Sequence, residues 1–190
     1  MIILASSSKT RAKILKDAKI DFKQIPVDFN EDSIKKSSPR SFVYYVMIGK
    51  LKEAIKKFGL KIPILVADTV VTTKGLILRK AKNKKEAKKI LELQSGSKVS
   101  IITAMAYKSK NIEFIDISAT HYIFNTFDKD DLKNYLDSKE WEGKAGACMV
   151  EGFCKKYIKK SVGYESCAKG LTVEKLKPFL LLDNQYDVRK

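Results

Sequence analysis

Apolar residues along the chain occur in two patterns, short continuous runs and stripes spaced three or four residues apart. The continuous runs predict buried strands or extended segments at 1–5, 22–27, 62–71, 76–78, 99–107, 112–124 and 157–162. The spaced stripes, with their flanking polar residues, predict helices at 11–18, 41–58, 84–93, 128–138 and 172–182. Strands and helices thus alternate along most of the chain, which predicts an α/β fold.

Serine, glycine and polar residues separate these segments where turns and helix ends are expected. Ser6-Ser7-Ser8 supplies N-cap residues for the first helix, and Gly59 ends the second. Lys74-Gly75 predicts a hairpin turn, and the polar residues 108–111 join two long strands. A glycine-rich segment follows at 143–152, but neither a repeat nor a linker is visible.

The length and apolar content predict one domain over residues 1–190. A chain of 190 residues with 44% hydrophobic residues is long enough for a substantial core, and only a short polar tail is expected after Leu182. No apolar run reaches the length of about eighteen residues that a membrane helix requires. The apolar residues 1–4 have no basic segment before them, unlike a secretory signal, so we expect a soluble, cytoplasmic protein without a membrane partner.

The charge balance favours an anionic partner without identifying it. Lys and Arg number 38 against 22 Asp and Glu, a net charge of +16, which attracts nucleic acid, acidic membranes or free nucleotides. A non-catalytic, basic nucleic-acid-binding protein is therefore an alternative, although no zinc finger or RNA-binding sheet motif is present. The lysine runs at 80–89 and 155–160 are expected to be solvated surface.

The cysteine set does not predict a zinc site. Cys148, Cys154 and Cys167 include no CxxC pair, and His121 is the only histidine. We expect reduced thiols.

Two local patterns predict chemistry. The serine turn between a strand and a helix directs backbone N–H groups and hydroxyls at one point, and Arg11 adds a cation, which together suit a phosphate. Asp68 follows a buried run and is expected at or near the end of a strand, where ligands of open α/β sheets gather. A simple helix cap and an Asp that caps the next turn are the respective alternatives.

Ordered motifs over nearly the whole chain resemble those of the Maf family. The matching segments are Leu4-Ala5-Ser6-Ser7-Ser8-Lys9-Thr10-Arg11, Glu31, Lys50, Ala67-Asp68-Thr69-Val70-Val71, Gly75 to Lys80, Leu93 to Gly96, Gly143 to Ala147 and Gly170-Leu171. The departures are Lys9, Arg79, Ala81, Val99 and Thr172, at positions where the family commonly has Pro, Gly, Pro, His and Pro. None of the departures removes a side chain to which chemistry is assigned.

The resemblance implies a nucleoside triphosphate pyrophosphatase with a mixed, elongated sheet flanked by helices and two lobes around a central nucleotide-binding cleft. By resemblance, Asp68 is the base that activates water, and Glu31 and Asp68 hold the divalent cation, Mg²⁺ or Mn²⁺. Arg11, Lys50 and Lys80 meet the triphosphate. Ser6 and Ser8 bind one phosphate.

The markers of base preference conflict. Glu151-Gly152 resembles the branch associated with 7-methylguanosine triphosphate, and a carboxylate can accept hydrogen bonds from a guanine-type N–H edge. Thr10 lacks the second Arg of the branch that prefers thymidine and uridine triphosphates, yet Ala67-Asp68-Thr69 is typical of that branch.

The family context implies further expectations about partners. Similar proteins are commonly homodimers. The family has been connected with septum formation and cell-division arrest, so a second alternative is a regulator of cell division that acts through a protein partner, a role that could coexist with hydrolysis. The expected partner is a nucleoside triphosphate, and no stable nucleic-acid partner is expected.

Overall fold

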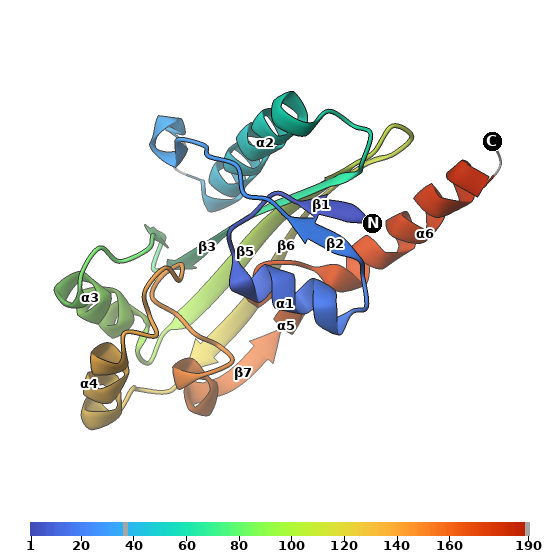
Figure 1. The fold of residues 1–190 in the computed structure, drawn as a ribbon. Coiled ribbons are helices and arrows are strands. Elements are labelled where there is room, and N and C mark those ends of the chain that lie inside the picture. Colours follow the sequence, from blue (N-terminus) through green and yellow to red (C-terminus); the bar gives the residue numbers. More distant parts are fainter. Residues whose placement is uncertain (36–37, 189–190) are drawn as a thin grey trace. The chain divides into compact units, whose positions relative to one another are not determined.

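The computed structural model describes residues 1–35 and 38–188, which form seven strands and six helices (Figure 1). The strands are β1 (Ile2–Leu4), β2 (Phe22–Gln24), β3 (Ile64–Thr73), β4 (Leu76–Leu78), β5 (Lys98–Lys108), β6 (Glu113–Phe124) and β7 (Ile158–Val162). The helices are α1 (Lys9–Asp17), α2 (Pro39–Phe58), α3 (Lys84–Gln94), α4 (Lys129–Ser138), α5 (Glu165–Ala168) and α6 (Val173–Val188). Two 3-10 turns, η1 (Glu31–Ser33) and η2 (Phe153–Tyr157), complete the described elements.

The sheet is mixed, as expected. Its strand order is β2-β1-β3-β5-β6-β7, and β4 pairs with β3. Strand β1 is parallel to both β2 and β3, whereas the β3–β4 and β6–β7 pairs are antiparallel. The chain divides into two compact units, and β3, β5 and β6 contribute residues to both. This arrangement confirms the α/β class with helices beside a mixed sheet.

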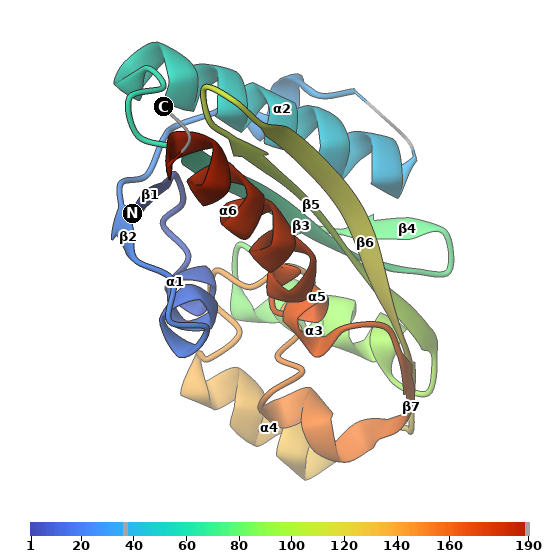
Figure 2. The same ribbon diagram turned by 90° about the vertical axis from the view of Figure 1, so that its right-hand side faces the viewer.

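The first unit comprises Met1–Asp68, Thr103–Ser118 and Lys169–Lys190. Its core joins apolar residues of β1, β3 and β5 to α1 and α6, which lie on the same side of these strands (Figure 2). Because side chains alternate along a strand, Ile64 and Val66 of β3 point to the opposite face from Leu65, and they too are fully buried. Asp68 continues the series of Ile64 and Val66, which places its carboxylate on the face that meets α2.

The second unit comprises Thr69–Ile102 and Ala119–Ala168. Aromatic rings supply much of its core, and the rings of Tyr135 and Phe153 stack with centroids 4.5 Å apart. Helices α3 and α4 contribute Leu91, Leu132 and other apolar residues to the same core.

Two expectations about the elements are corrected. The last helix does not end at Leu182 but continues to Val188, and Asp183, the first polar residue after Leu182, is held in the core. The carboxylate of Asp183 is buried and accepts hydrogen bonds from the hydroxyls of Tyr107 and Ser109. The short helix α5 was not expected, since four residues carry no readable periodicity.

Two further features concern the cysteines and the apolar character of the described helices. Cys148, Cys154 and Cys167 are free thiols. Among residues 1–35 and 38–188, no helix combines the length and the apolar character needed to cross a membrane.

Candidate functional site

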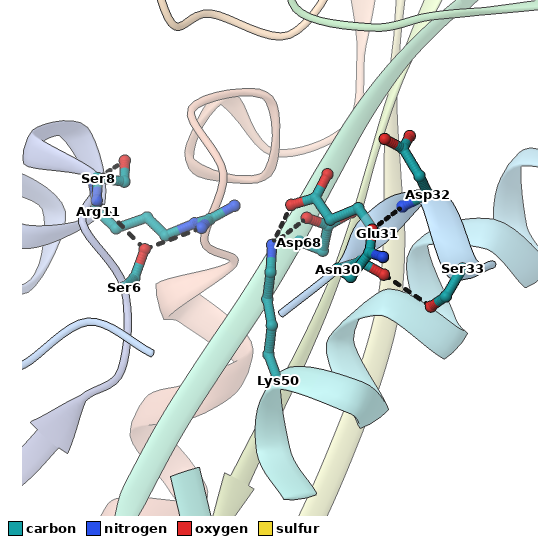
Figure 3. A network of polar contacts seen from close by, with 9 residues as sticks. All are labelled: Ser6, Ser8, Arg11, Asn30, Glu31, Asp32, Ser33, Lys50 and Asp68. Carbon is teal, nitrogen blue, oxygen red and sulfur yellow. Dashed lines mark hydrogen bonds and ion pairs between the residues drawn. The ribbon is translucent and has the colours of Figure 1, made fainter. Parts of the chain in front are cut away.

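Three charged side chains from three elements of the first unit meet at the ammonium of Lys50. The Lys50 ammonium lies 2.7 Å from Oδ1 of Asp68 and 2.7 Å from Oε1 of Glu31 (Figure 3). Asp68 comes from β3, Lys50 from α2 and Glu31 from η1. Glu31 is the most exposed of the three, with 38% of its side-chain surface accessible against 9% for Asp68. The carboxylates therefore face each other across one buried ammonium, open on the Glu31 side.

Asp68 does not lie at the end of its strand. Strand β3 continues from Asp68 to Thr73, so Asp68 caps no turn and occupies the middle of a buried strand. An ionisable group at such a position costs stability unless it is paired, and Lys50 provides the pair. The sequence suggested a strand end because the carboxylate interrupts the apolar run.

Gly49 fixes the segment that carries Glu31, and sequence reasoning missed it. A Cβ atom at Gly49 would lie 2.2 Å from the Phe29 ring, so only glycine lets that ring pack against α2. Asn30 then caps η1 by accepting a hydrogen bond from the backbone N–H of Asp32. The available signal was a glycine inside a predicted helix, which costs about 1 kcal/mol relative to alanine and usually has a packing reason.

Burial and the oppositely charged neighbours shift the pKa values of Asp68 and Arg11 in opposite directions. Burial raises the pKa of Asp68, and the ammonium of Lys50 counteracts part of that rise. Glu31 raises the pKa of Asp68 further, whereas Arg11 lowers it. Burial likewise lowers the pKa of Arg11, against the effect of Asp68 and Glu31, but a guanidinium remains charged. Two cations and two carboxylates therefore interact within one site.

The serine turn and Arg11 form a second hydrogen-bonded group in the same unit. Ser8 caps α1 by accepting a hydrogen bond from the backbone N–H of Arg11 at 3.3 Å. The guanidinium of Arg11 donates to Oγ of Ser6 at 3.0 Å and to the carbonyl of Gly170 at 2.8 Å. The helix-cap interpretation of Ser8 is thus correct, and the cap leaves α1 with its N-terminus at the serine turn, a feature that attracts anions.

Gln24 holds the serine turn in place and was not expected from the sequence. Its side-chain amide donates to the carbonyl of Ser6 at 2.7 Å and to that of Ser8 at 3.2 Å. No sequence signal marks Gln24, since a glutamine in a short strand has no characteristic pattern. The carbonyls of Ser6 and Ser8 thereby each accept a hydrogen bond.

Lys80 belongs to the second unit, whereas six of the other candidate residues belong to the first. It is exposed after β4 and forms an isolated bridge with Ala145. The adjoining Gly146 has φ +60°, and a Cβ there would approach the side chain of Val71 to 2.7 Å, so the segment requires glycine. The buried amide of Gln94 donates to the Gly146 carbonyl at 2.7 Å. These contacts fix the backbone beside Lys80.

Glu151 also lies in the second unit, on the glycine-rich segment. Its nearest described cation is the ammonium of Lys144, at 4.0 Å, and 30% of the Glu151 side chain and 25% of the Lys144 side chain are exposed. The sequence singled out Glu151 but gave no reason to pair it with Lys144. The two charges thus stand together on an accessible segment.

The donors of the first unit fit a hard divalent cation. Within residues 1–35 and 38–188 no three His, Cys, Asp or Glu side chains cluster as a complete ligand set. Mg²⁺, however, is commonly held by one or two carboxylates together with water and substrate phosphates. Glu31 and Asp68 supply such a pair, with their oxygens converging on one point.

Comparisons with known proteins find similarity over nearly the whole chain. A sequence profile described as "Maf-like protein" matches residues 1–181. A "Nucleoside triphosphate pyrophosphatase" of Nitratiruptor sp. is 57% identical over 178 residues, which cover 93% of this chain and 96% of that protein. Proteins of the same name from Helicobacter pylori and Campylobacter jejuni are 39% and 38% identical, over 92% and 95% of this chain and 92% and 100% of theirs. A solved Ham1 protein of Staphylococcus aureus aligns with a TM-score of 0.45 and 13% identity, over 65% of this chain and 71% of that one.

Proposed function

Because the chain belongs to the Maf-like protein family, we propose that it hydrolyses a nucleoside triphosphate to the nucleoside monophosphate and pyrophosphate. The observation that carries this proposal is the pair of carboxylates, Glu31 and Asp68, joined by Lys50 in the unit that also holds the serine turn. Phosphoryl transfer needs cations for the phosphates and a carboxylate for water, and this unit holds both.

The serine turn and the cations bind the triphosphate in this proposal. The N-terminus of α1 and the hydroxyls of Ser6 and Ser8 accept one phosphate, and Arg11 grips its oxygens through two N–H groups. Lys50 contributes a point charge, as does Lys80 from the second unit. Arg11 already donates to Ser6, so its guanidinium is held toward the turn before substrate arrives.

Asp68 serves as the general base. As a water oxygen forms its bond to the α-phosphorus, the carboxylate of Asp68 takes one water proton, and the bond from the α-phosphorus to the bridging oxygen breaks. Pyrophosphate leaves with that oxygen, and the nucleoside monophosphate gains the oxygen of water. The raised pKa of Asp68 makes it a stronger base than an exposed aspartate.

Glu31 and Asp68 would hold the divalent cation, with Mg²⁺ or Mn²⁺ as the candidates. When bound, the cation neutralises charge on the phosphates and stabilises pyrophosphate as a leaving group. Glu31, the more exposed carboxylate, would help to hold this cation and would not act as the base.

Glu151 determines the choice of base in this proposal. Its carboxylate accepts hydrogen bonds from an N–H edge, as guanine-type bases present, and Lys144 beside it donates to a base carbonyl. Methylated or otherwise modified triphosphates, 7-methylguanosine triphosphate among them, are therefore the substrates to compare with the triphosphates of thymidine and uridine.

The proposed setting is the cytoplasm, and the proposed purpose is the removal of modified nucleotides. The proposed assembly is a homodimer, and cell-division arrest is an associated role.

A substrate panel tests the proposal. The purified protein is incubated with Mg²⁺ and common or methylated nucleoside triphosphates, and monophosphate and pyrophosphate are both quantified. We expect equimolar release that disappears in Asp68→Asn and on chelation of the metal, and that persists in Asp17→Asn, a change at an exposed carboxylate on α1. Absence of release from every substrate would refute the proposal, and salt-sensitive binding to long RNA or DNA would then support a nucleic-acid binder.

A further inference from the structure

The Lys50 ammonium occupies the point at which two carboxylate oxygens converge. Its Nζ atom lies 2.7 Å from Oε1 of Glu31 and from Oδ1 of Asp68, the residues that would hold the divalent cation (Figure 3). On the basis of the proposed function, we propose that Lys50 is the resident counter-cation of this carboxylate pair. It keeps free metal out of the site, so that the metal binds only together with the phosphates of a nucleotide.

Lys50 and a metal ion compete for the same oxygens. An ammonium has three N–H donors and no acceptor, and two of the three are directed at Glu31 and Asp68. Mg²⁺ requires its oxygen ligands at about 2.0–2.1 Å in an ordered geometry, which leaves no room for an ammonium between the same two oxygens. Metal binding to these two oxygens therefore requires Lys50 to move away.

The charges around the carboxylate pair offset one another, so free metal competes weakly with Lys50. The carboxylates of Glu31 and Asp68 carry two negative charges, and Lys50 and Arg11, which interacts electrostatically with both, carry two positive charges. Among the described residues these four charges sum to zero, so the two cations offset the attraction of the carboxylates for a divalent cation. The burial of Asp68 strengthens its attachment to the ammonium that is already present.

A triphosphate removes this obstacle. Its oxygens bring about four negative charges near neutral pH and offer Lys50 acceptors that are more highly charged than a carboxylate. Once Lys50 turns to the phosphates, the oxygens of Glu31 and Asp68 become available, and the phosphates supply further metal ligands. Lys50 thus links occupancy by metal to occupancy by substrate.

A purely structural ion pair would behave differently. If Lys50 only compensates for the burial of Asp68 and the two carboxylates hold no metal, its removal would destabilise the fold and leave metal affinity unchanged or lower. If it is the resident counter-cation, its removal leaves a net negative site and raises the affinity for metal. Metal affinity therefore separates the two roles without any measurement of turnover.

The first test measures binding of Mn²⁺ alone, from the electron paramagnetic resonance signal of free Mn²⁺ at pH 7.5. We compare the wild-type protein with Lys50→Met and with Lys52→Met, a control that removes an equal charge from an exposed position on the same helix. Lys50→Met is expected to bind Mn²⁺ about tenfold or more tightly than the other two, because one repelling charge at close range has gone. Adding Glu31→Gln to Lys50→Met should abolish the gain.

Equal affinity in Lys50→Met and the wild-type protein would overturn the proposal. Circular dichroism and thermal melting identify a variant that fails to fold, and Lys50→Gln, which keeps a polar side chain of similar length, then replaces Lys50→Met. A gain that survives Glu31→Gln would also contradict the proposal, since the added metal would be bound elsewhere.

The second test adds a triphosphate whose α,β-bridging oxygen is replaced by methylene, so that hydrolysis cannot occur. With the analogue present, the wild-type protein is expected to bind Mn²⁺ at least about tenfold more tightly than the Mn²⁺ affinities of the protein alone and of the analogue alone would predict. Equally tight binding of Mn²⁺ without nucleotide would overturn the proposal. If no nucleotide analogue binds at all, the proposed pyrophosphatase function fails, while the Lys50→Met comparison still decides the role of Lys50 toward metal.

Discussion

Oδ1 of Asp68, in the middle of a buried strand, lies 2.7 Å from the ammonium of Lys50 on the helix that covers it. Glu31 approaches the same ammonium from a more exposed position, so the two carboxylates have different environments. A buried carboxylate with a raised pKa is suited to take a proton, and an exposed one is suited to share a cation with substrate. These different environments therefore suit the two carboxylates to the different roles proposed for them.

Asp68→Asn and Glu31→Gln should have distinct kinetic effects. Loss of a general base lowers turnover by roughly 10²–10⁴-fold, and Asp68→Asn is expected in this range with little change in binding of a nonhydrolysable nucleotide. Glu31→Gln should instead increase the Mg²⁺ concentration needed for half-maximal activity. Steady-state kinetics over a Mg²⁺ series, with nucleotide binding measured by calorimetry, distinguishes the two. The same Mg²⁺ requirement in Glu31→Gln as in wild type would contradict the metal role of Glu31.

The pH dependence of stability should reveal the burial of Asp68. The pKa of Asp68 in the folded protein is above its ordinary value, so the folded state binds the proton more tightly than the unfolded state does. Its contribution to stability is therefore greatest below the unfolded pKa and is lost as pH rises through the folded pKa. Asp68→Asn cannot ionise and lacks this loss.

We accordingly expect the melting temperature of Asp68→Asn, relative to that of wild type, to rise as pH increases from about 4 to 7. Thermal melts of both proteins over this range measure the difference, and Asp17→Asn serves as an exposed control. A difference that falls with pH would show that Lys50 outweighs burial and holds the pKa of Asp68 below its ordinary value.

The regular elements were predictable because their signals are local. Apolar periodicity located the long helix α2 and the strands β3, β5 and β6 to within a few residues. The predicted strand 62–71 enclosed Asp68, but the expected position at or near a strand end was wrong, since the partner from α2 that stabilises a carboxylate within a buried strand cannot be read from the sequence. The extension of α6 beyond Leu182 depended in the same way on a distant partner, Tyr107.

The candidate site was located by motif order rather than by local physics. Lys50 is one lysine among many, and only its place in the ordered motifs distinguished it from the exposed Lys52. Gly49 and Gln24 were missed because they act through other residues, one by admitting the Phe29 ring and the other by holding the serine turn. Such supporting residues depend on tertiary contacts that no single-sequence pattern records.

Gly49→Ala should impair activity although alanine favours helices. The substitution gains about 1 kcal/mol in helix propensity, but the new Cβ would overlap the Phe29 ring, and relieving that overlap costs about 1–3 kcal/mol. The ring must move, and the adjoining segment with Glu31 moves with it, so we expect a higher Mg²⁺ requirement. Kinetics and thermal melting measure both effects. Phe29→Ala in the Gly49→Ala background should remove the overlap and recover stability, and no recovery would contradict the packing role of Gly49.

Tyr107→Phe should weaken the attachment of the last helix without affecting catalysis. The substitution removes one of the two hydroxyls that donate to the buried carboxylate of Asp183. A buried charged group that loses a hydrogen bond costs about 1–3 kcal/mol. We expect a lower unfolding free energy in urea and faster amide hydrogen exchange near Asp183, with kcat unchanged. Unchanged exchange would show that Ser109 alone holds the carboxylate.

Cys148 should react slowly with alkylating reagents despite its partial exposure. Its thiol lies beside that of Cys154, with the two sulfur atoms 3.5 Å apart, and this contact together with burial raises the pKa of Cys148 well above the usual range. Because the thiolate is the reactive form, very little of Cys148 is reactive near pH 7.5. We expect incorporation of iodoacetamide into the folded protein to be far slower than into the urea-unfolded protein, as followed by mass spectrometry.

Cys154→Ser removes the neighbouring thiol and should accelerate labelling of Cys148, whereas Cys167→Ser, at a thiol outside this pair, should not. Equal labelling rates in the folded and unfolded proteins would contradict the raised pKa.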